Sequence, residues 1–327
     1  MIADPVTLQI SLAPSDLRHA EILLPHQIRA WRSQISEILI TVDFHRSAGR
    51  FSAQWESGRE KILTLASSIE GARILAVDYE EPAMLHVAKT FFGSPRSLPA
   101  KDFRGGPFYS YFFALHAAQN DYVFHMDSDL FFGGGSHTWV KEAIELMRAK
   151  PEIFVTAPLP GPPNPSGRLR QLSAVRRPGN SLAYDFTDMS TRLFLVDRRR
   201  FEGDFGPLKV THPSGRSCLK AWIEGNPTAN LPEHLISSRM RERGLLRHDF
   251  LGSPPGTWSL HPPYRCADFY GKLPELVRRV EAGDMPEAQL GDHDINDSLV
   301  DWSEARNQLQ QNRWWRRILK SNRWTRK

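Results

Sequence analysis

The chain has 327 residues, of which 42 are Lys or Arg and 37 are Asp or Glu, so its formal net charge is +5. This length leaves ample chain for a hydrophobic core and excludes a small disulfide-stapled scaffold. The basic excess is too small over this length to indicate nucleic-acid binding. The two cysteines, Cys218 and Cys266, lack metal-ligand spacing and fit a reducing, cytoplasmic setting.

Neither a signal peptide nor a membrane-spanning helix is expected. Asp4 stands where a secretory signal carries basic residues. The longest uncharged stretches, residues 105–120 and 153–167, are short and are interrupted by Pro, Gly, His or Asn. We therefore expect a cytoplasmic protein that is soluble or peripheral at the inner face of the membrane.

The N-terminal half alternates apolar, β-branched runs with segments of helical period. Strands are predicted at residues 6–12, 37–43, 73–78, 122–126 and 153–157. Helices are predicted at residues 17–34 (broken or kinked at Pro25), 58–69 and 106–120, and after the capping residue Ser136. Such alternation predicts an α/β fold whose mostly parallel central sheet is flanked by helices on both faces.

The amino-acid composition of the chain changes after Pro158. Residues 158–171 are rich in Pro and Gly and are expected to form an ordered loop or linker over the site. A strand follows at residues 192–196, and the Gly, Pro and Ser of residues 211–225 indicate another loop. Residues 230–244, with a capping Asn, an early Pro and a terminal Gly, should form a helix.

Carboxylates follow three of the predicted strands. Asp43 and Asp78 end two of them, and Asp127 and Asp129 come directly after a third. Because parallel strands share a carboxyl edge, these acids should lie at one edge of the sheet. Two carboxylates spaced i and i+2 can hold Mg²⁺ or Mn²⁺ together with a diphosphate. A second D-x-D, at residues 292–294, has no strand before it and is interpreted as a solvated loop or helix start.

The chain resembles glycosyltransferases of the GT-A fold, especially family 2, in the order of its motifs. A strand ending at Pro14 is followed by a strand ending at Asp43 and then by the strand with its D-x-D. The resemblance implies that Asp43 contacts the base or ribose of a nucleotide-sugar donor. It implies that Asp127 and Asp129 contact the ribose and a Mn²⁺ or Mg²⁺ ion on the diphosphate. Pro14 and Asp78 are expected beside the same donor.

The resemblance continues downstream. Family 2 enzymes carry an acidic pair at a helix start, and Glu233 matches the acid that serves as catalytic base, while Pro232 replaces the first acid. His261 would add a ligand to the metal or the diphosphate. Arg104 could face a phosphate as a planar donor. Asp249 is the reserve candidate for the base.

These observations predict a metal-dependent, inverting glycosyltransferase. Residues 1–210 would form the nucleotide-sugar-binding core, 211–285 an acceptor-side catalytic region, and 286–327 a helical basic tail. The acceptor would be a glycan, a lipid-linked molecule or a small molecule, and no nucleic acid is expected to bind. A sugar-phosphate nucleotidyltransferase and a degenerate, non-catalytic nucleotide- or glycan-binding protein are the alternatives.

The C-terminal segment has its own pattern. Residues 313–327 hold seven basic residues, no acids and three tryptophans, which suits either an anionic membrane surface or a frayed, solvated tail. The Q-x-x-R-W string at residues 310–314 matches one of processive polysaccharide synthases, but without a membrane span we interpret it as coincidence.

Overall fold

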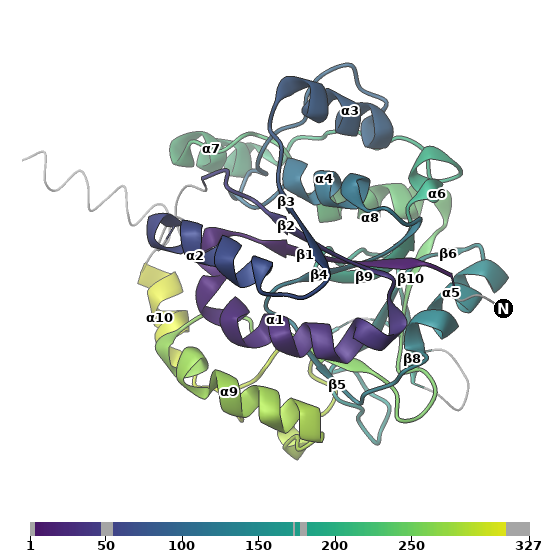
Figure 1. Cartoon of the computed structure of the whole chain (residues 1–327), viewed down its shortest axis with the longest axis vertical. Coiled ribbons are helices and arrows are strands. Elements are labelled where there is room, and N and C mark those ends of the chain that lie inside the picture. The colour runs from purple at the N-terminus through teal and green to yellow at the C-terminus, as the bar shows by residue number, and fades with distance from the viewer. Residues whose placement is uncertain (1–3, 47–54, 173, 177–181, 312–327) are drawn as a thin grey trace, which may run out of the picture.

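A computed structural model describes residues 4–46, 55–172, 174–176 and 182–311. A central β sheet lies between two layers of helices, with a third group of helices below one layer (Figure 1). The α/β fold with helices on both faces is confirmed. Within the described residues, every helix is too short or too polar to cross a bilayer. The basic segment at residues 313–327 lies outside the part of the chain that is described.

The N-terminal half of the sheet is parallel. Strands β1 (Val6–Leu12), β2 (Glu37–Val42), β3 (Ala72–Ala76) and β4 (Tyr122–Asp127) lie in the order β3-β2-β1-β4. Their apolar residues are continuous because both faces are covered, as in other parallel sheets. On β4, Val123 packs with the helices on one face and Phe124 with those on the other.

The second half makes the sheet mixed. Strand β9 (Leu193–Asp197) runs antiparallel between β4 and β6 (Ile153–Pro160), and β10 (Leu246–Phe250) is parallel to β6. Two antiparallel strands, β8 (Ala183–Phe186) and β7 (Val175–Arg176), end the sheet. Strand β11 (Trp258–Leu260) pairs with β6 and with β5 (Phe131–Gly133).

The helices form three groups. One face of the sheet is covered by α1 (Leu17–Trp31), α2 (Trp55–Ser67) and α5 (Trp139–Ala149). The other is covered by α3 (Glu81–Phe92), α4 (Tyr109–Ala117), α6 (Arg199–Glu202) and α8 (Pro232–Arg243). The third group, α9 (Ala267–Ala282) and α10 (Ser303–Gln311), packs with β5 and β11. Short 3₁₀ turns occupy Pro14–Asp16 (η1), Arg32–Gln34 (η2) and Glu287–Gln289 (η4).

The structure differs from several predicted elements. Pro25 lies within the continuous helix α1, and α3 occupies a stretch for which no helix was predicted. The loop predicted at residues 211–225 is wrong over most of its length, because Gly215–Glu224 form helix α7. Its Gly and Ser residues lie at the helix start, where they do not oppose helix formation. The N-cap residues of α5 and α8 are Thr138 and Leu231, one or two positions beyond the predicted caps.

Candidate functional site

A pocket of about 290 Å³ opens at the carboxyl ends of β1, β2 and β4. Ligands bind at this edge in open α/β sheets. The predicted arrangement is confirmed, because Asp43, Asp78 and Asp127 end or follow parallel strands at the same edge, and Asp129 lies two residues further. The pocket is lined by Ser11, Leu12, Ala13, Ser15, Asp16, Thr41, Asp43, Val77, Lys101, Gly105, Gly106, Pro107, Ser110, Asp127, Ser128, Arg192 and Arg265.

On one side of the pocket, the carboxylate of Asp43 accepts three hydrogen bonds. The Nζ of Lys101 donates to its Oδ2 at 2.7 Å, and the hydroxyl of Tyr79 donates to its Oδ1 at 2.9 Å. The backbone N–H of His45 donates to Oδ1 at 2.8 Å. Burial and the nearby Asp43 charge raise the pKa of Tyr79, so this hydroxyl keeps its proton and remains a donor. These three donors hold the Asp43 carboxylate in one orientation.

The segment after Lys101 forms a tight turn at the pocket wall. The carboxylate of Asp102 accepts hydrogen bonds from the backbone N–H groups of Arg104 and Gly106 at 2.7 and 3.0 Å. Gly105 has a φ of +79°, a conformation that glycine adopts without strain. The side chain of Arg104 is exposed, lies over the ring of Phe103 and does not line the pocket.

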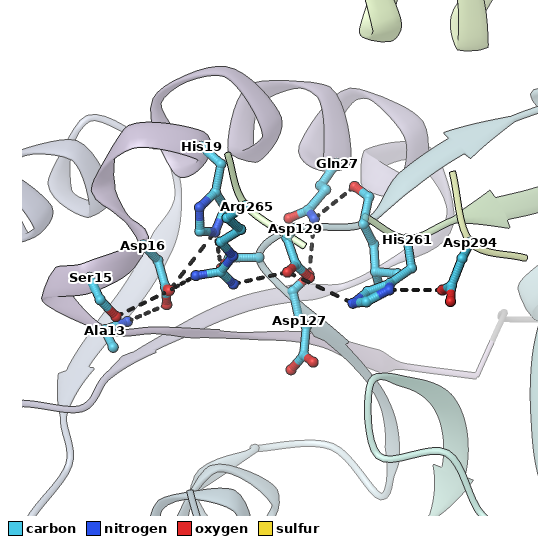
Figure 2. A network of polar contacts seen from close by, with 12 residues as sticks. Ala13, Ser15, Asp16, His19, Gln27, Asp127, Asp129, His261, Arg265 and Asp294 are labelled. Carbon is cyan, nitrogen blue, oxygen red and sulfur yellow. Dashed lines mark hydrogen bonds and ion pairs between the residues drawn. The ribbon is translucent and has the colours of Figure 1, made fainter. Parts of the chain in front are cut away.

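On the other side of the pocket, one arginine joins two acids. Arg265 donates through Nη2 to Oδ2 of Asp129 at 2.9 Å and through Nη1 to Oδ1 of Asp16 at 3.0 Å (Figure 2). Arg265 lines the pocket, whereas Asp129 is buried and does not. The carboxylates of Asp127 and Asp129 point in different directions in Figure 2. The pocket therefore exposes Asp127 directly and Asp129 through its arginine partner.

The charge of Asp129 is compensated by its neighbours. Burial alone would raise the pKa of Asp129, but the positive charge of Arg265 holds it below its usual range. The second oxygen of this carboxylate, Oδ1, is buried and has no hydrogen-bond partner in the described part of the chain. A buried acceptor of this kind is costly unless a donor or a cation approaches it.

His261 connects the two D-x-D motifs. Its Nε2 lies 3.9 Å from Oδ2 of Asp129, and its Nδ1 lies 3.0 Å from Oδ1 of Asp294. The interpretation of residues 292–294 as a solvated segment is wrong, because Asp292 is buried and Asp294 is held against His261. A carboxylate on one imidazole nitrogen fixes the ring and directs the other nitrogen, here toward Asp129.

The predicted bases occupy different surroundings. Glu233, in the first turn of α8, accepts from the backbone N–H of Thr191 at 3.3 Å. Thr191 precedes Arg192, which lines the pocket, but Glu233 itself does not line it. Asp249 is buried in β10 and accepts two hydrogen bonds from Arg247, at 2.9 and 2.7 Å, so it is already paired.

Two further predicted residues lie close to the pocket without lining it. Asp78 is exposed and accepts from the backbone N–H of Glu80 at 2.8 Å, while its neighbour Val77 lines the wall. Pro14 is buried in η1, between the lining residues Ala13 and Ser15.

Three basic lining residues escaped the sequence analysis: Lys101, Arg192 and Arg265. Lys101 lies in a stretch for which no element was predicted, and Arg192 is the first residue of a predicted strand. Nothing in their local sequence distinguishes them from surface residues. Arg265 follows His261 by four positions, so its proximity to that candidate ligand was the available signal.

Comparisons with known proteins leave the family open. No model of a protein family matches the chain, and no curated protein does. Solved structures that resemble it include a mycobacterial protein, with 11% identity, a TM-score of 0.34 and coverage of 85% of this chain and 73% of that one. They also include S. aureus TarS 1-349, with 8% identity, a TM-score of 0.36 and coverage of 87% and 67%.

Proposed function

We propose that the protein is a glycosyltransferase that moves a sugar from a nucleoside-diphosphate donor to an acceptor hydroxyl. The observation that carries the proposal is the pocket itself. It brings an oriented carboxylate, Asp43, and two arginines, Arg192 and Arg265, to the carboxyl edge of a parallel sheet. The resemblance of the motif order to GT-A enzymes supports the same assignment.

The two sides of the pocket suit the two ends of a nucleoside diphosphate. Asp43 accepts hydrogen bonds from a base or from ribose hydroxyls, because its lone pairs are held in place by Lys101 and Tyr79. Arg265 and Arg192 face the diphosphate, for which the planar guanidinium is suited. Arg192 lines the pocket and makes no ion pair with a described residue, although its charge acts on the nearby Asp127.

Asp127 and Asp129 are the candidate protein ligands for a hard divalent cation. Asp127 and Asp129 supply oxygen atoms, the unpartnered Oδ1 of Asp129 lacks a donor or cation, and the Nε2 of His261 is directed toward the same carboxylate. The described residues contain no group of three His, Cys, Asp or Glu side chains that could hold a metal. Mg²⁺ and Mn²⁺ commonly complete such a set with substrate phosphates and water. When bound, the ion would neutralise charge on the departing diphosphate.

The remaining requirement is a base for the acceptor hydroxyl. We assign this role to Glu233, because it lies in the first turn of α8 and contacts Thr191, the neighbour of the lining residue Arg192. Removal of the hydroxyl proton as the new glycosidic bond forms gives direct displacement and inversion at the anomeric carbon. The acceptor class, the domain boundaries at residues 210 and 285, and the membrane role of the basic tail stay predictions.

Release of free nucleoside diphosphate from a panel of UDP-, GDP- and dTDP-sugars tests turnover. We expect release with one donor that depends on Mn²⁺ or Mg²⁺ and stops with a chelator. Release of pyrophosphate from a nucleoside triphosphate and a sugar phosphate would instead assign the nucleotidyltransferase alternative. Donor binding without release in the presence of candidate acceptors would assign the non-catalytic one.

A further inference from the structure

Helix α7 turns its apolar side outward. Leu219, Trp222 and Ile223 lie along one side of the helix and are 51%, 77% and 39% exposed. The inward side instead carries an ion pair, Lys220 to Glu224 at 3.2 Å, in which the side chains are only 30% and 15% exposed. A helix that packs only on its own protein shows the opposite polarity. This side of α7 is therefore built to contact something outside the chain.

The segment that carries α7 is ordered at its base. Its two ends are joined by hydrogen bonds from the backbone N–H of Asn230 to the carbonyl of Thr211 at 2.9 Å and from its Nδ2 to the Thr211 hydroxyl at 2.8 Å. The helix stands at the periphery of the molecule, beyond the carboxyl ends of β1 and β2 (Figure 1). The apolar side of α7 is therefore exposed in a segment whose base is held by hydrogen bonds.

Charge identifies the class of partner. Residues 207–228 contain Lys209, Arg216 and Lys220 but only one acid, Glu224, which is already paired with Lys220. Lys209 and Arg216 are exposed and make no ion pair with a described residue, and Arg216 lies on α7 itself, one turn before Leu219. Apolar and Trp side chains flanked by Lys and Arg suit an anionic lipid surface.

The size of the patch argues against a second copy of the chain. The exposed large apolar side chains of residues 207–228 are the three on α7 and Val210, which is 38% exposed. A stable dimer needs roughly 800 Å² from each partner, which four side chains do not supply. Interfacial insertion requires no minimum area of this kind, because apolar burial and electrostatic attraction add to each other.

We propose that α7 docks the protein onto an anionic bilayer surface, with Leu219, Trp222 and Ile223 inserted at headgroup depth. The proposal goes beyond the proposed function, since it requires neither a donor nor transfer. It also places the pocket near the lipid. Asn226, just past α7, donates through Nδ2 to the carbonyl of Phe103 at 3.5 Å, and the nearby Gly105 lines the pocket.

Sedimentation of the full chain with phosphatidylcholine vesicles containing phosphatidylglycerol tests the proposal. The test variant is Leu219→Ser, Trp222→Ser and Ile223→Ser combined, and the matched control is Leu63→Ser, an exposed leucine on α2. We expect the triple variant to lose about tenfold or more in lipid partitioning, because three apolar side chains no longer enter the interface. Trp222→Phe and the control should bind as the unmodified protein does.

Three results would overturn the proposal. The first is that the triple variant binds the vesicles as well as the unmodified chain does, which would assign binding to another segment. The second is that the unmodified chain does not bind at low salt. The third is that it binds pure phosphatidylcholine vesicles as well as those that contain phosphatidylglycerol. A dimer that dissociates in the triple variant, measured by light scattering, would assign the surface to a second copy. Unchanged circular dichroism and melting of the triple variant exclude misfolding as the cause of lost binding, and none of these readouts depends on donor turnover.

Discussion

Arg104 was predicted to face a phosphate, whereas Arg265 was not predicted as a site residue. Both are arginines that a diphosphate could use, yet only Arg265 lines the pocket, and Arg104 lies exposed over Phe103. Arg265→Ala should weaken donor binding by about ten- to a hundredfold, the range expected for charged hydrogen bonds of ~1.5–3 kcal/mol. Calorimetric titration of the donor measures the effect. Arg104→Ala is the matched control, and equal losses in the two variants would contradict the assignment.

The pair of Lys101 and Asp43 should matter for stability as well as for binding. The two side chains are 7% and 10% exposed, so Lys101→Met leaves a carboxylate nearly buried and uncompensated. Loss of one partner of such a pair costs about 3–5 kcal/mol. Urea unfolding measures this loss. Lys141→Met is the control, because its pair with Glu145 is 71% and 61% exposed and should contribute at most about 1 kcal/mol.

Glu233→Gln tests the mechanism separately from the donor site. If Glu233 removes the acceptor proton, turnover should fall by about 10²–10⁴-fold while donor affinity stays nearly unchanged. The rate of nucleoside-diphosphate release and the donor dissociation constant measure the two effects. Near-normal turnover, or retained anomeric configuration in the product by NMR, would remove Glu233 from the role assigned to it.

Residues at strand ends were predictable, and residues brought in from distant loops were not. Asp43 and Asp127 follow recognisable apolar strands, so the topology of a parallel sheet brings them to one edge. Arg265 and Asp294 arrive from loops more than a hundred residues further along the chain. Their contacts depend on how β11 pairs with β5 and β6, which hydrophobic periodicity does not encode.

Helix α2 packs against η1 at Gly58, where the close approach leaves no room for a side chain. A Cβ on Gly58 would lie 2.2 Å from the carbonyl oxygen of Pro14. Gly58→Ala should therefore shift η1, lower the melting temperature and weaken donor binding, since Ala13 and Ser15 line the pocket. Gly215→Ala is the control, because a Cβ there meets nothing within 4 Å. Equal melting temperatures for the two variants would show that this close approach is not maintained in solution.

The strands of the parallel half were foreseeable because they are apolar on both faces, although helix α3 between two of them was not predicted. Helix α7 was not, because its Gly, Ser and Pro signals resemble a loop and its apolar side faces out instead of toward the core. The antiparallel strand β9 was predicted as a strand, but its direction depends on a long connection from β6. Length and periodicity do not fix such a direction.

For the molecule as a whole, buried histidines link folding to pH. Burial lowers the pKa of His19 to about 4 and that of His125 to about 3, whereas an unfolded histidine has a pKa near 6.5. Below pH 6.5 the unfolded chain binds protons that the native protein does not, so these groups make the unfolding free energy fall as the pH drops toward 4. Each contributes a slope of up to about 1.4 kcal/mol per pH unit.

Urea unfolding between pH 7.5 and 5 measures this slope. The exposed His45 provides a control, because His45→Gln should leave the slope unchanged. A midpoint that stays constant or rises on acidification through this range would contradict the account of two histidines buried in the neutral form.

The central claim is that the pocket bounded by Asp43 and Arg265 binds the diphosphate donor. Thermal-shift measurement of the unmodified protein with UDP-, GDP- and dTDP-sugars, with and without Mn²⁺, tests it most directly, because a ligand that binds the native state raises the melting temperature by mass action. We expect a shift with one nucleotide class that is larger with Mn²⁺ and is reduced in Asp43→Asn and Arg265→Ala. The absence of any shift across the panel, or a shift that both variants retain in full, would contradict it.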